Sequence, residues 1–336
     1  MTARSIATAI LLASTATLLA QRNLEVGIST GVTQYYGDLG NWNGQVQWNS
    51  TRPALNITFR DFFNNPKRYV TRSLTMECRL SWFRIGYNEV QPTGGESGIG
   101  LHNFKRGLNF RNDLFGASAH MVLNAYREPF TPLFKQRFFM YFHLGIGMYY
   151  GRPKADLFRG DPDLSNRYYY WEDGSIRDTP RGSAEGTVIE QDGKYETDLY
   201  SWTIEGRGKG SSSTIQERTS PWNIGIPMGC GIRYMVTRKM SIGAEFSYYM
   251  FLTDMLDAVS ERYLTYDEIG QVYADSTQQY LARYISDPTG WGTDGTQGFR
   301  TSRRGNPGLP DNFSYFSFEV SYKLDRRPGR RNYMSF

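Results

Sequence analysis

The residues of this 336-residue sequence that could perform acid–base chemistry lie in stretches where polar and apolar residues alternate. Paired carboxylates can act as general acid and base, and a chain of such groups can carry protons. Four acids and four bases can instead neutralise one another as ion pairs inside a fold, because buried unpaired charge is costly. The signs balance here, so an ion-paired interior is favoured over a proton path or a catalytic carboxylate pair. The eight residues are Glu25, Arg60, Glu77, Arg79, Arg233, Glu245, Glu319 and Lys323.

Two of the three histidines, His120 and His143, occur in the same polar phase. A hydrolase or acyltransferase would place such a histidine beside a serine and an acid, for which Ser118 and Glu77 are candidates. The sequence has no G-x-S-x-G motif and no H-x-x-x-H or C-x-x-C spacing for zinc. We therefore expect hydrogen-bonded interior histidines, with no catalytic site, no metal site, no cofactor and no small-molecule substrate.

The element that must position these residues is a β-strand, because the alternation has a period of two. It is clearest in residues 137–151, RFFMYFHLGIGMYYG, where one phase is apolar over seven positions and the other holds small residues and a histidine. The same pattern predicts eight strands, at about 24–36, 53–60, 74–82, 109–124, 137–151, 222–234, 240–250 and 315–324.

The connections between the predicted strands alternate in length, as they do in outer-membrane barrels. Most of the strands have about ten alternating residues, which is the length that crosses a membrane. We therefore predict an all-β fold: an eight-stranded antiparallel transmembrane outer-membrane β-barrel (OmpA-like) with a plugged polar lumen, long extracellular loops and both termini periplasmic. The long connections cover 37–51, 88–108, 152–220 and 253–312, and the short ones cover 61–72, 125–136 and 235–239.

A soluble sandwich or a lipocalin-like barrel is the alternative, since apolar strand faces can also line a water-soluble core. In that case the opposite phase should be rich in Lys and Glu. It is instead composed of Gly, Ser, Thr and Asn with isolated charges. This composition fits a narrow, packed polar lumen and an apolar surface that faces lipid.

The two ends of the chain have their own patterns. Residues 1–20 have a basic residue, an apolar run and Ala20 at a cleavage position, which is typical of a secretory signal peptide. Residues 21–325 would then form the barrel, and 326–336 a basic periplasmic tail. The tail either lies solvated near anionic headgroups or docks an acidic partner. Its arginines are Arg326, Arg327, Arg330 and Arg331.

Several other motifs have simpler explanations. Cys78 and Cys230 fall on strands that are not neighbours, so we expect no disulfide. The stretch GRGKGSSS at 206–213 lacks P-loop spacing and is expected to be a flexible loop. The stretch RGDPD at 159–163 offers too few regularly spaced oxygens for calcium.

With strands and loops placed, several stretches resemble the PorG family of outer-membrane barrels from the type IX secretion system of Bacteroidetes. The most specific stretch is WNIGIPMGCGIRYMVTRKMSIGAEFSYYMFLTDMLDAVS at 222–260. The others are TQYYGDLG (33–40), LNFRNDLFGASAHMVLN (108–124), FFMYFHLGIGMYY (138–150) and FSFEVSYKL (316–324). The loops at 152–220 and 253–312 are longer than this family leads us to expect.

The resemblance implies a non-enzymatic protein that attaches a periplasmic ring of the lipoprotein PorK and its partner PorN to the outer membrane. Its partners would be outer-membrane lipids and those ring subunits, with no nucleic acid. A general OmpA-like surface or adhesion protein is a second hypothesis, and a barrel-embedded lipid-modifying enzyme is a third.

Overall fold

The structure is a computed structural model of the whole chain. It describes residues 24–39, 48–62, 73–90, 104–125, 137–184, 186–208, 214–216, 219–237, 239–291 and 304–324. The structural statements below concern these residues.

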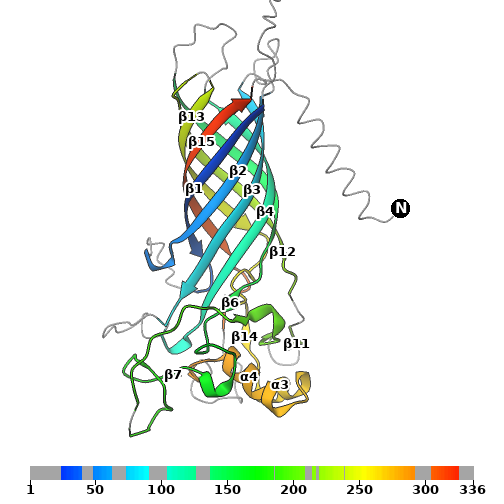
Figure 1. The fold of residues 1–336 in the computed structure, drawn as a ribbon. Coiled ribbons are helices and arrows are strands. Elements are labelled where there is room, and N and C mark those ends of the chain that lie inside the picture. The colour runs from blue at the N-terminus through cyan, green and yellow to red at the C-terminus, as the bar shows by residue number, and fades with distance from the viewer. Residues whose placement is uncertain are drawn as a thin grey trace, which may run out of the picture.

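Eight long antiparallel strands form a closed barrel (Figure 1). Each strand pairs with its neighbours along the chain, and β1 pairs with β15 over its whole length to close the ring. The predicted fold class is therefore confirmed. The strands are β1 (Leu24–Tyr36), β2 (Arg52–Phe62), β3 (Leu74–Asn88), β4 (Asn109–Asn124), β5 (Phe138–Tyr150), β12 (Trp222–Met235), β13 (Met240–Phe251) and β15 (Asn312–Leu324).

One strand fills a gap that the sequence pattern left open. The alternation assigned the third strand only as far as residue 82 and placed the next connection from residue 88, and β3 continues to Asn88, paired with β4 as far as Asn109. The extra residues include Phe83 and Ile85, which are fully buried. These inward side chains belong to the hydrophobic core at the barrel mouth, which this part of β3 shares with the cap.

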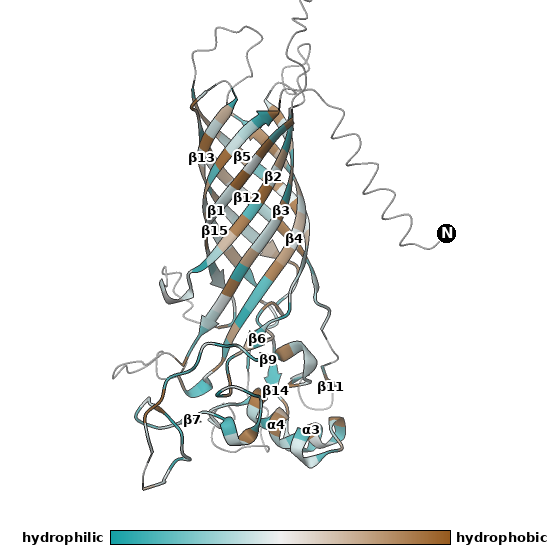
Figure 2. Cartoon of the chain, in the orientation of Figure 1, coloured by the Kyte–Doolittle hydropathy of each residue, from teal (hydrophilic) through white to brown (hydrophobic). Residues whose placement is uncertain are grey.

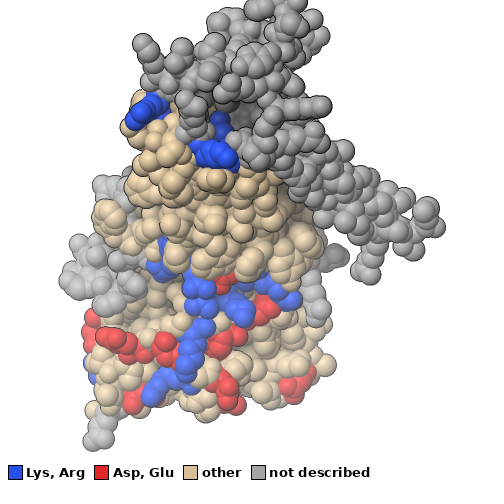
Figure 3. All heavy atoms as spheres, turned by 45° about the horizontal axis from the view of Figure 1, so that its top comes forward, with Lys and Arg blue, Asp and Glu red and all other residues tan. Residues whose placement is uncertain are grey.

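The outer face of the barrel is an apolar belt. Along β5 the outward side chains from Phe138 to Tyr150 are 37–61% exposed, while the inward ones are buried or half-buried. A strand of this length is roughly 40 Å long and rises about 28 Å at a tilt of about 45°, close to the apolar band of outer-membrane barrels, which is about 25 Å tall. Figure 3 shows a band without charged side chains between a basic rim at one end and mixed charges at the other. Exposed apolar surface of this extent indicates that the barrel spans a membrane.

Glycines on the inner face of β12 make room for large side chains from β5. A Cβ on Gly231 would lie 2.4 Å from the ring of Tyr141, and one on Gly229 would lie 2.6 Å from Nε2 of His143. Both distances are shorter than any real contact, so the alternating glycines allow these side chains to lie across the lumen.

The described parts of residues 151–221 and 252–311 fold together at one end of the barrel into a unit that we call the cap (Figure 1). We predicted these segments as loops, and the cap shows that they also contain short strands and two helices. Its elements include β6 (Lys154–Ala155), β7 (Tyr169–Tyr170), β8 (Ile176–Arg177), β9 (Thr197–Asp198), β10 (Glu205–Arg207), β11 (Thr214–Ile215), β14 (Arg262–Tyr263), α3 (Tyr266–Val272) and α4 (Ser276–Ser286).

The cap has a hydrophobic core of its own. Leu264, Ile269 of α3 and Ala282 of α4 form one buried cluster. Thr265 and Glu268 begin α3 with reciprocal side-chain to backbone hydrogen bonds, which satisfy donors at the helix start. Figure 2 shows hydrophobic residues within the cap as well as on the barrel. No helix in the described part of the chain has the length and apolarity of a membrane span.

Aromatic rings fill the barrel mouth beneath the cap. Tyr249 and Phe313 stack with ring centroids 4.7 Å apart, and Phe83 lies 4.8–5.2 Å from Tyr249, Phe313 and Tyr315. All four side chains are fully buried. The lumen is therefore closed at this end by a packed layer of rings.

Candidate functional site

Arg60 on β2 is the centre of the charged groups in the lumen. It is fully buried, and its guanidinium donates to Glu25 on β1 at 3.1 Å, to Glu77 on β3 and to Glu319 on β15. The register places Glu25 opposite Arg60 and Arg60 opposite Glu77, so these groups meet on adjacent strands. One cation thus joins carboxylates from three other strands across the interior.

Arg79 on β3 forms the second centre. It donates to Glu77 and makes two bonds to Glu245 on β13, at 2.5 and 2.8 Å. The hydroxyl of Tyr141 also donates to Glu245, at 2.8 Å. Glu77 therefore bridges the two arginines, and the network spans the barrel from β1 to β13.

The remaining two predicted charges lie nearer the end where the short turns connect the strands. Arg233 is 3.8 Å from Glu319 and stacks over Tyr141, with its guanidinium carbon 4.6 Å from the ring centre. Lys323 is opposite Glu25 in the strand register and is half-buried. Together with Glu25 and Arg233 it lines a cavity of about 10 Å³, which has room for about one water molecule. The structure thus brings the eight predicted charges into one lumen.

The two histidines form a hydrogen-bonded chain beside the ion pair of Arg79 and Glu245. Ser118 Oγ lies 2.8 Å from His120 Nε2, and the two histidine Nδ1 atoms are 3.2 Å apart. His143 Nε2 then lies 3.1 Å from Ser247 Oγ and 3.3 Å from Glu245 Oε1. The acid of this chain is Glu245, and not Glu77 as we predicted, because His143 contacts Glu245 while the two oxygens of Glu77 accept from Arg60 and Arg79. Ser118 and both histidines are at most 6% exposed, so a substrate has no direct access to them.

The two cysteines are unpaired, on β3 and β12. Strands β4 and β5 separate them in the sheet order. This arrangement agrees with the expected absence of a disulfide.

The cap contains a cavity of about 570 Å³ between residues 164–181 and 263–290. Tyrosine and arginine side chains dominate its lining, including Tyr169, Tyr266, Tyr280, Arg167 and Arg283. Both arginines stack on tyrosines, Arg167 on Tyr169 at 4.6 Å and Arg283 on Tyr266 at 4.0 Å. Guanidinium groups beside aromatic rings suit a ligand with an anionic group and a flat face. No sequence motif indicated this cavity, because its walls come from two separate loops.

Buried acids link the cap to the barrel mouth. Burial and the charge of Asp311 raise the pKa of Asp257 well above its usual range, and burial does the same for Asp311. Burial also raises the pKa of Asp38 to about 7, although the Asn306 backbone N–H and Arg106 act in the opposite direction. Arg106 donates to the backbone oxygens of Asp38 and Arg304, and so links the segments that carry them.

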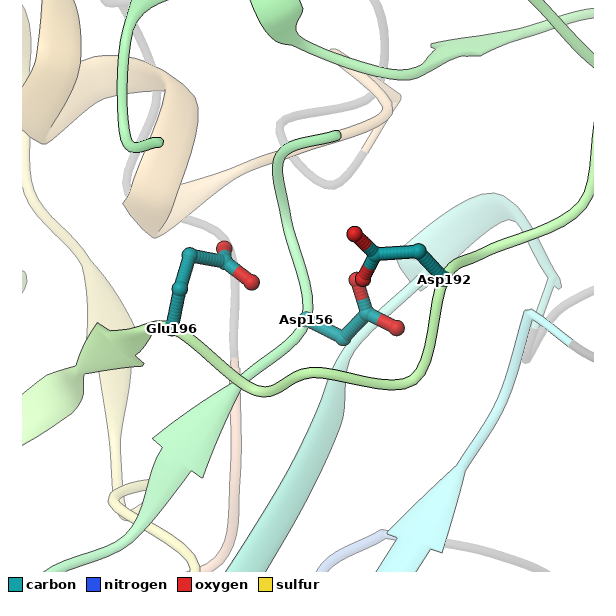
Figure 4. Close-up of side chains that lie close together, drawn as sticks. All are labelled: Asp156, Asp192 and Glu196. Carbon is teal, nitrogen blue, oxygen red and sulfur yellow. The ribbon is translucent and has the colours of Figure 1, made fainter. Parts of the chain in front are cut away.

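Three further carboxylates meet at the base of the cap (Figure 4). Asp156, Asp192 and Glu196 each place an oxygen within 4.8 Å of the other two. Burial, followed by the charges of Glu196 and Asp192, raises the pKa of Asp156 to about 6, although the backbone N–H of Gly193 opposes this. Sequence reasoning missed this cluster, because 35 residues separate Asp156 from Asp192 and no ligand motif joins them.

Other predicted features lie wholly or partly outside the described residues. They are the signal peptide at 1–20, residues 209–213 of GRGKGSSS, most of the turns at 61–72 and 125–136, and the tail with Arg326, Arg327, Arg330 and Arg331. The described start of GRGKGSSS departs from the flexible loop we expected. Gly206 and Arg207 belong to β10, which pairs with β11 and β14.

No family profile matches the chain, and no curated protein matches it. Solved structures to which it is similar include Neisserial surface protein A, with 9% identity, a TM-score of 0.33, and 90% of this chain and 97% of that chain covered. Ail of Yersinia pestis, in complex with the heparin analogue sucrose octasulfate, has 8% identity, a TM-score of 0.32, and 90% and 100% covered. The outer-membrane protease OmpT from Escherichia coli has 8% identity, a TM-score of 0.33, and 91% and 98% covered. At these values the similarity supports no statement about what this chain does.

Proposed function

We propose that this chain is a non-enzymatic outer-membrane component of the type IX secretion system, which holds a periplasmic ring of PorK and PorN at the membrane. The structural observation that carries the proposal is the filled lumen. Arg60 and Arg79 join carboxylates from four strands, and aromatic rings close the barrel mouth. Such a barrel is suited to be a rigid anchor rather than a pore. The sequence resemblance of residues 222–260 supplies the identity of the ring.

The end of the barrel with the short turns carries positive charge, which supports this end as the docking side. Arg137, Lys239 and Lys323 lie at the ends of β5, β13 and β15 there, and Figure 3 shows a basic rim. The four tail arginines follow Leu324 directly in the sequence. Clustered guanidinium groups attract acidic protein surfaces and phosphate groups alike.

The test is recovery of the ring subunits with the full-length protein extracted in mild detergent. Changing Arg326, Arg327, Arg330 and Arg331 to Ser should release the ring while the barrel still inserts. Changing the same four to Lys is the matched control and should retain most of the ring, because the charge remains. Full ring recovery with the Ser variant would exclude the tail as the docking site, and failure of the wild-type protein to recover the ring would contradict the proposed function.

The proposed orientation places the cap outside the cell and both termini in the periplasm. An epitope inserted beside Ser212, within the cap segment 151–221, should be labelled on intact cells. Labelling only after lysis would show that the opposite orientation is correct and that the tail does not lie in the periplasm.

A surface protein that binds ligands through its cap is the second candidate, and the cavity of about 570 Å³ favours it. The variant Arg283→Gln should then reduce binding of cells to immobilised acidic oligosaccharides. Arg152→Gln is the matched control, because Arg152 belongs to the cap but pairs with Asp198 outside the cavity. Equal binding by cells with and without the wild-type protein would exclude this candidate for that class of ligand.

A further inference from the structure

The carboxylate cluster at the base of the cap has little positive charge to balance it. Among the described residues, the ion pair that the structure gives for the cluster joins Asp192 to Lys194 at 3.1 Å, and that lysine side chain is 66% exposed. Asp156 is only 2% exposed. Two acids and a buried third thus lie together with one solvent-exposed cation beside them.

Two buried oxygens of the cluster, Oδ1 of Asp156 and Oε2 of Glu196, accept no hydrogen bond of standard length. The hydroxyl of Tyr168 is the neutral donor beside the Asp156 carboxylate, and it adds no positive charge. The other oxygen of each carboxylate is held by the backbone. Asp156 Oδ2 accepts from the N–H of Gly193 at 2.7 Å, and Glu196 Oε1 accepts from the N–H groups of Leu157 and Phe158 at 2.9 and 3.0 Å. The two carboxylates are therefore fixed in place, each with one oxygen that lacks a hydrogen bond of standard length. A buried acceptor without a donor is costly, and a bound cation would remove that cost.

We propose that Asp156, Asp192 and Glu196 bind one divalent cation, and that this cation is Ca²⁺. Carboxylate oxygens are the ligands of hard cations, whereas zinc and copper sites favour nitrogen or sulfur. Bonds of 2.3–2.6 Å to Ca²⁺ can span oxygens that lie within 4.8 Å of one another. Mg²⁺, with bonds of about 2.0–2.1 Å and strict octahedral geometry, is less suited to three protein carboxylates.

The site would attach the cap to the barrel. The side chain of Asn109, the first residue of β4, makes two hydrogen bonds with the backbone of Asp156, at 2.7 and 3.0 Å. Gln191 donates to the same carbonyl at 3.0 Å and accepts from Asn88, the last residue of β3, at 2.6 Å. A cation held by Asp156, Asp192 and Glu196 would therefore fix residues 192–196 to a segment that is already bonded to β3 and β4.

The test uses the full-length protein in detergent, freed of metal with a chelator and titrated with Ca²⁺ by calorimetry. One Ca²⁺ should bind, and the melting temperature should rise with Ca²⁺ concentration because the ion binds the folded state alone. The variants Asp156→Asn and Glu196→Gln should each lose at least tenfold in affinity. The matched control Glu172→Gln, an exposed acid of the same segment, should bind like wild type.

A measurement without metal separates loss of the site from loss of the fold. In chelator, Asp156→Asn should melt at or above the temperature of the wild-type protein, because the amide removes repulsion between carboxylates. In Ca²⁺ the wild-type protein should have the higher melting temperature of the two, because only it binds the ion tightly. An unchanged wild-type melting temperature between chelator and millimolar Ca²⁺ would overturn the site, as would equal Ca²⁺ binding by Asp156→Asn. A melting temperature that rises with Mg²⁺ but not with Ca²⁺ would overturn the choice of Ca²⁺ as the bound ion.

Discussion

The carboxyl groups of Asp257 and Asp311 both contact the hydroxyl of Tyr35. The hydroxyl of Tyr35 lies 2.7 Å from Oδ2 of Asp257 and 2.6 Å from Oδ1 of Asp311. A phenol has one proton, so it can donate to only one of the two acids, and the other contact needs a proton on the second carboxyl group. The geometry therefore predicts a protonated acid at the point where the cap meets the barrel mouth.

This arrangement predicts that acidic pH stabilises the cap. The pKa values of Asp257 and Asp311 are raised, and that of Asp38 is raised to about 7, so the folded state keeps protons that the unfolded chain releases above about pH 4. Their contribution to stability is therefore present at low pH and is lost as pH rises through the raised values. Thermal unfolding of the cap, followed by near-UV circular dichroism between pH 5 and pH 8, measures this slope.

The variant Asp257→Asn isolates the effect from other titrating groups. An amide keeps an acceptor for the N–H of Val259, which Asp257 accepts at 2.8 Å, and it can donate to Tyr35. At pH 8 the variant should melt a few degrees above the wild-type protein, and at pH 5 the two should converge. A pH slope identical to that of wild type would show that these acids do not share a proton.

Removing the central cation of the lumen should destabilise the barrel strongly. Arg60→Met leaves Glu25, Glu77 and Glu319 without their shared partner, and breaking a buried ion pair from one side costs about 3–5 kcal/mol. Arg84→Met is the matched control, because its pair with Asp113 is about one-third exposed and worth about 0–1 kcal/mol. Urea unfolding in lipid vesicles measures the free energy of unfolding of each variant relative to the wild-type protein.

The lumen should carry no steady ionic current. The ion pairs of Arg60 and Arg79 and the ring layer of Tyr249 and Phe313 occupy the interior, and an eight-stranded barrel is only wide enough for side chains to fill it. Planar bilayers with the purified protein should show baseline conductance. Reproducible single-channel steps at moderate voltage would contradict a filled lumen.

The apolar belt predicts a depth-dependent cost for charge. Ile146 is 61% exposed near the middle of β5, so Ile146→Arg should cost about 2–4 kcal/mol of stability in lipid. Leu252 is 69% exposed just beyond the end of β13, and Leu252→Arg should cost about 0–1 kcal/mol. If Ile146→Arg and Leu252→Arg lose the same stability in the same vesicles, the apolar belt is placed wrongly along the barrel.

The barrel was predictable from the sequence because strand geometry is local. Successive side chains of a strand point to opposite faces, so the alternation in residues 138–150 assigns each side chain to lipid or lumen without knowledge of its partners. The predicted strands at 24–36 and 109–124 have the same bounds in the structure. The alternation ended early in β3 because the outward side chain after Trp82 is Arg84, which pairs with Asp113 of β4, while the inward Phe83 and Ile85 join the buried core at the barrel mouth.

What the sequence by itself determined is therefore the barrel and the face of each strand residue, since a period of two follows from backbone geometry alone. The tertiary structure decided which inward charges pair and how the long connections fold. Tyr35 lies 222 residues from Asp257 and 276 from Asp311. Such groups meet only when closure of the barrel fixes the loop ends and the cap core selects one packing of the segments between them. Side-chain contacts between distant segments have no sequence period, so the cavity of the cap and its carboxylate cluster could be found only in three dimensions.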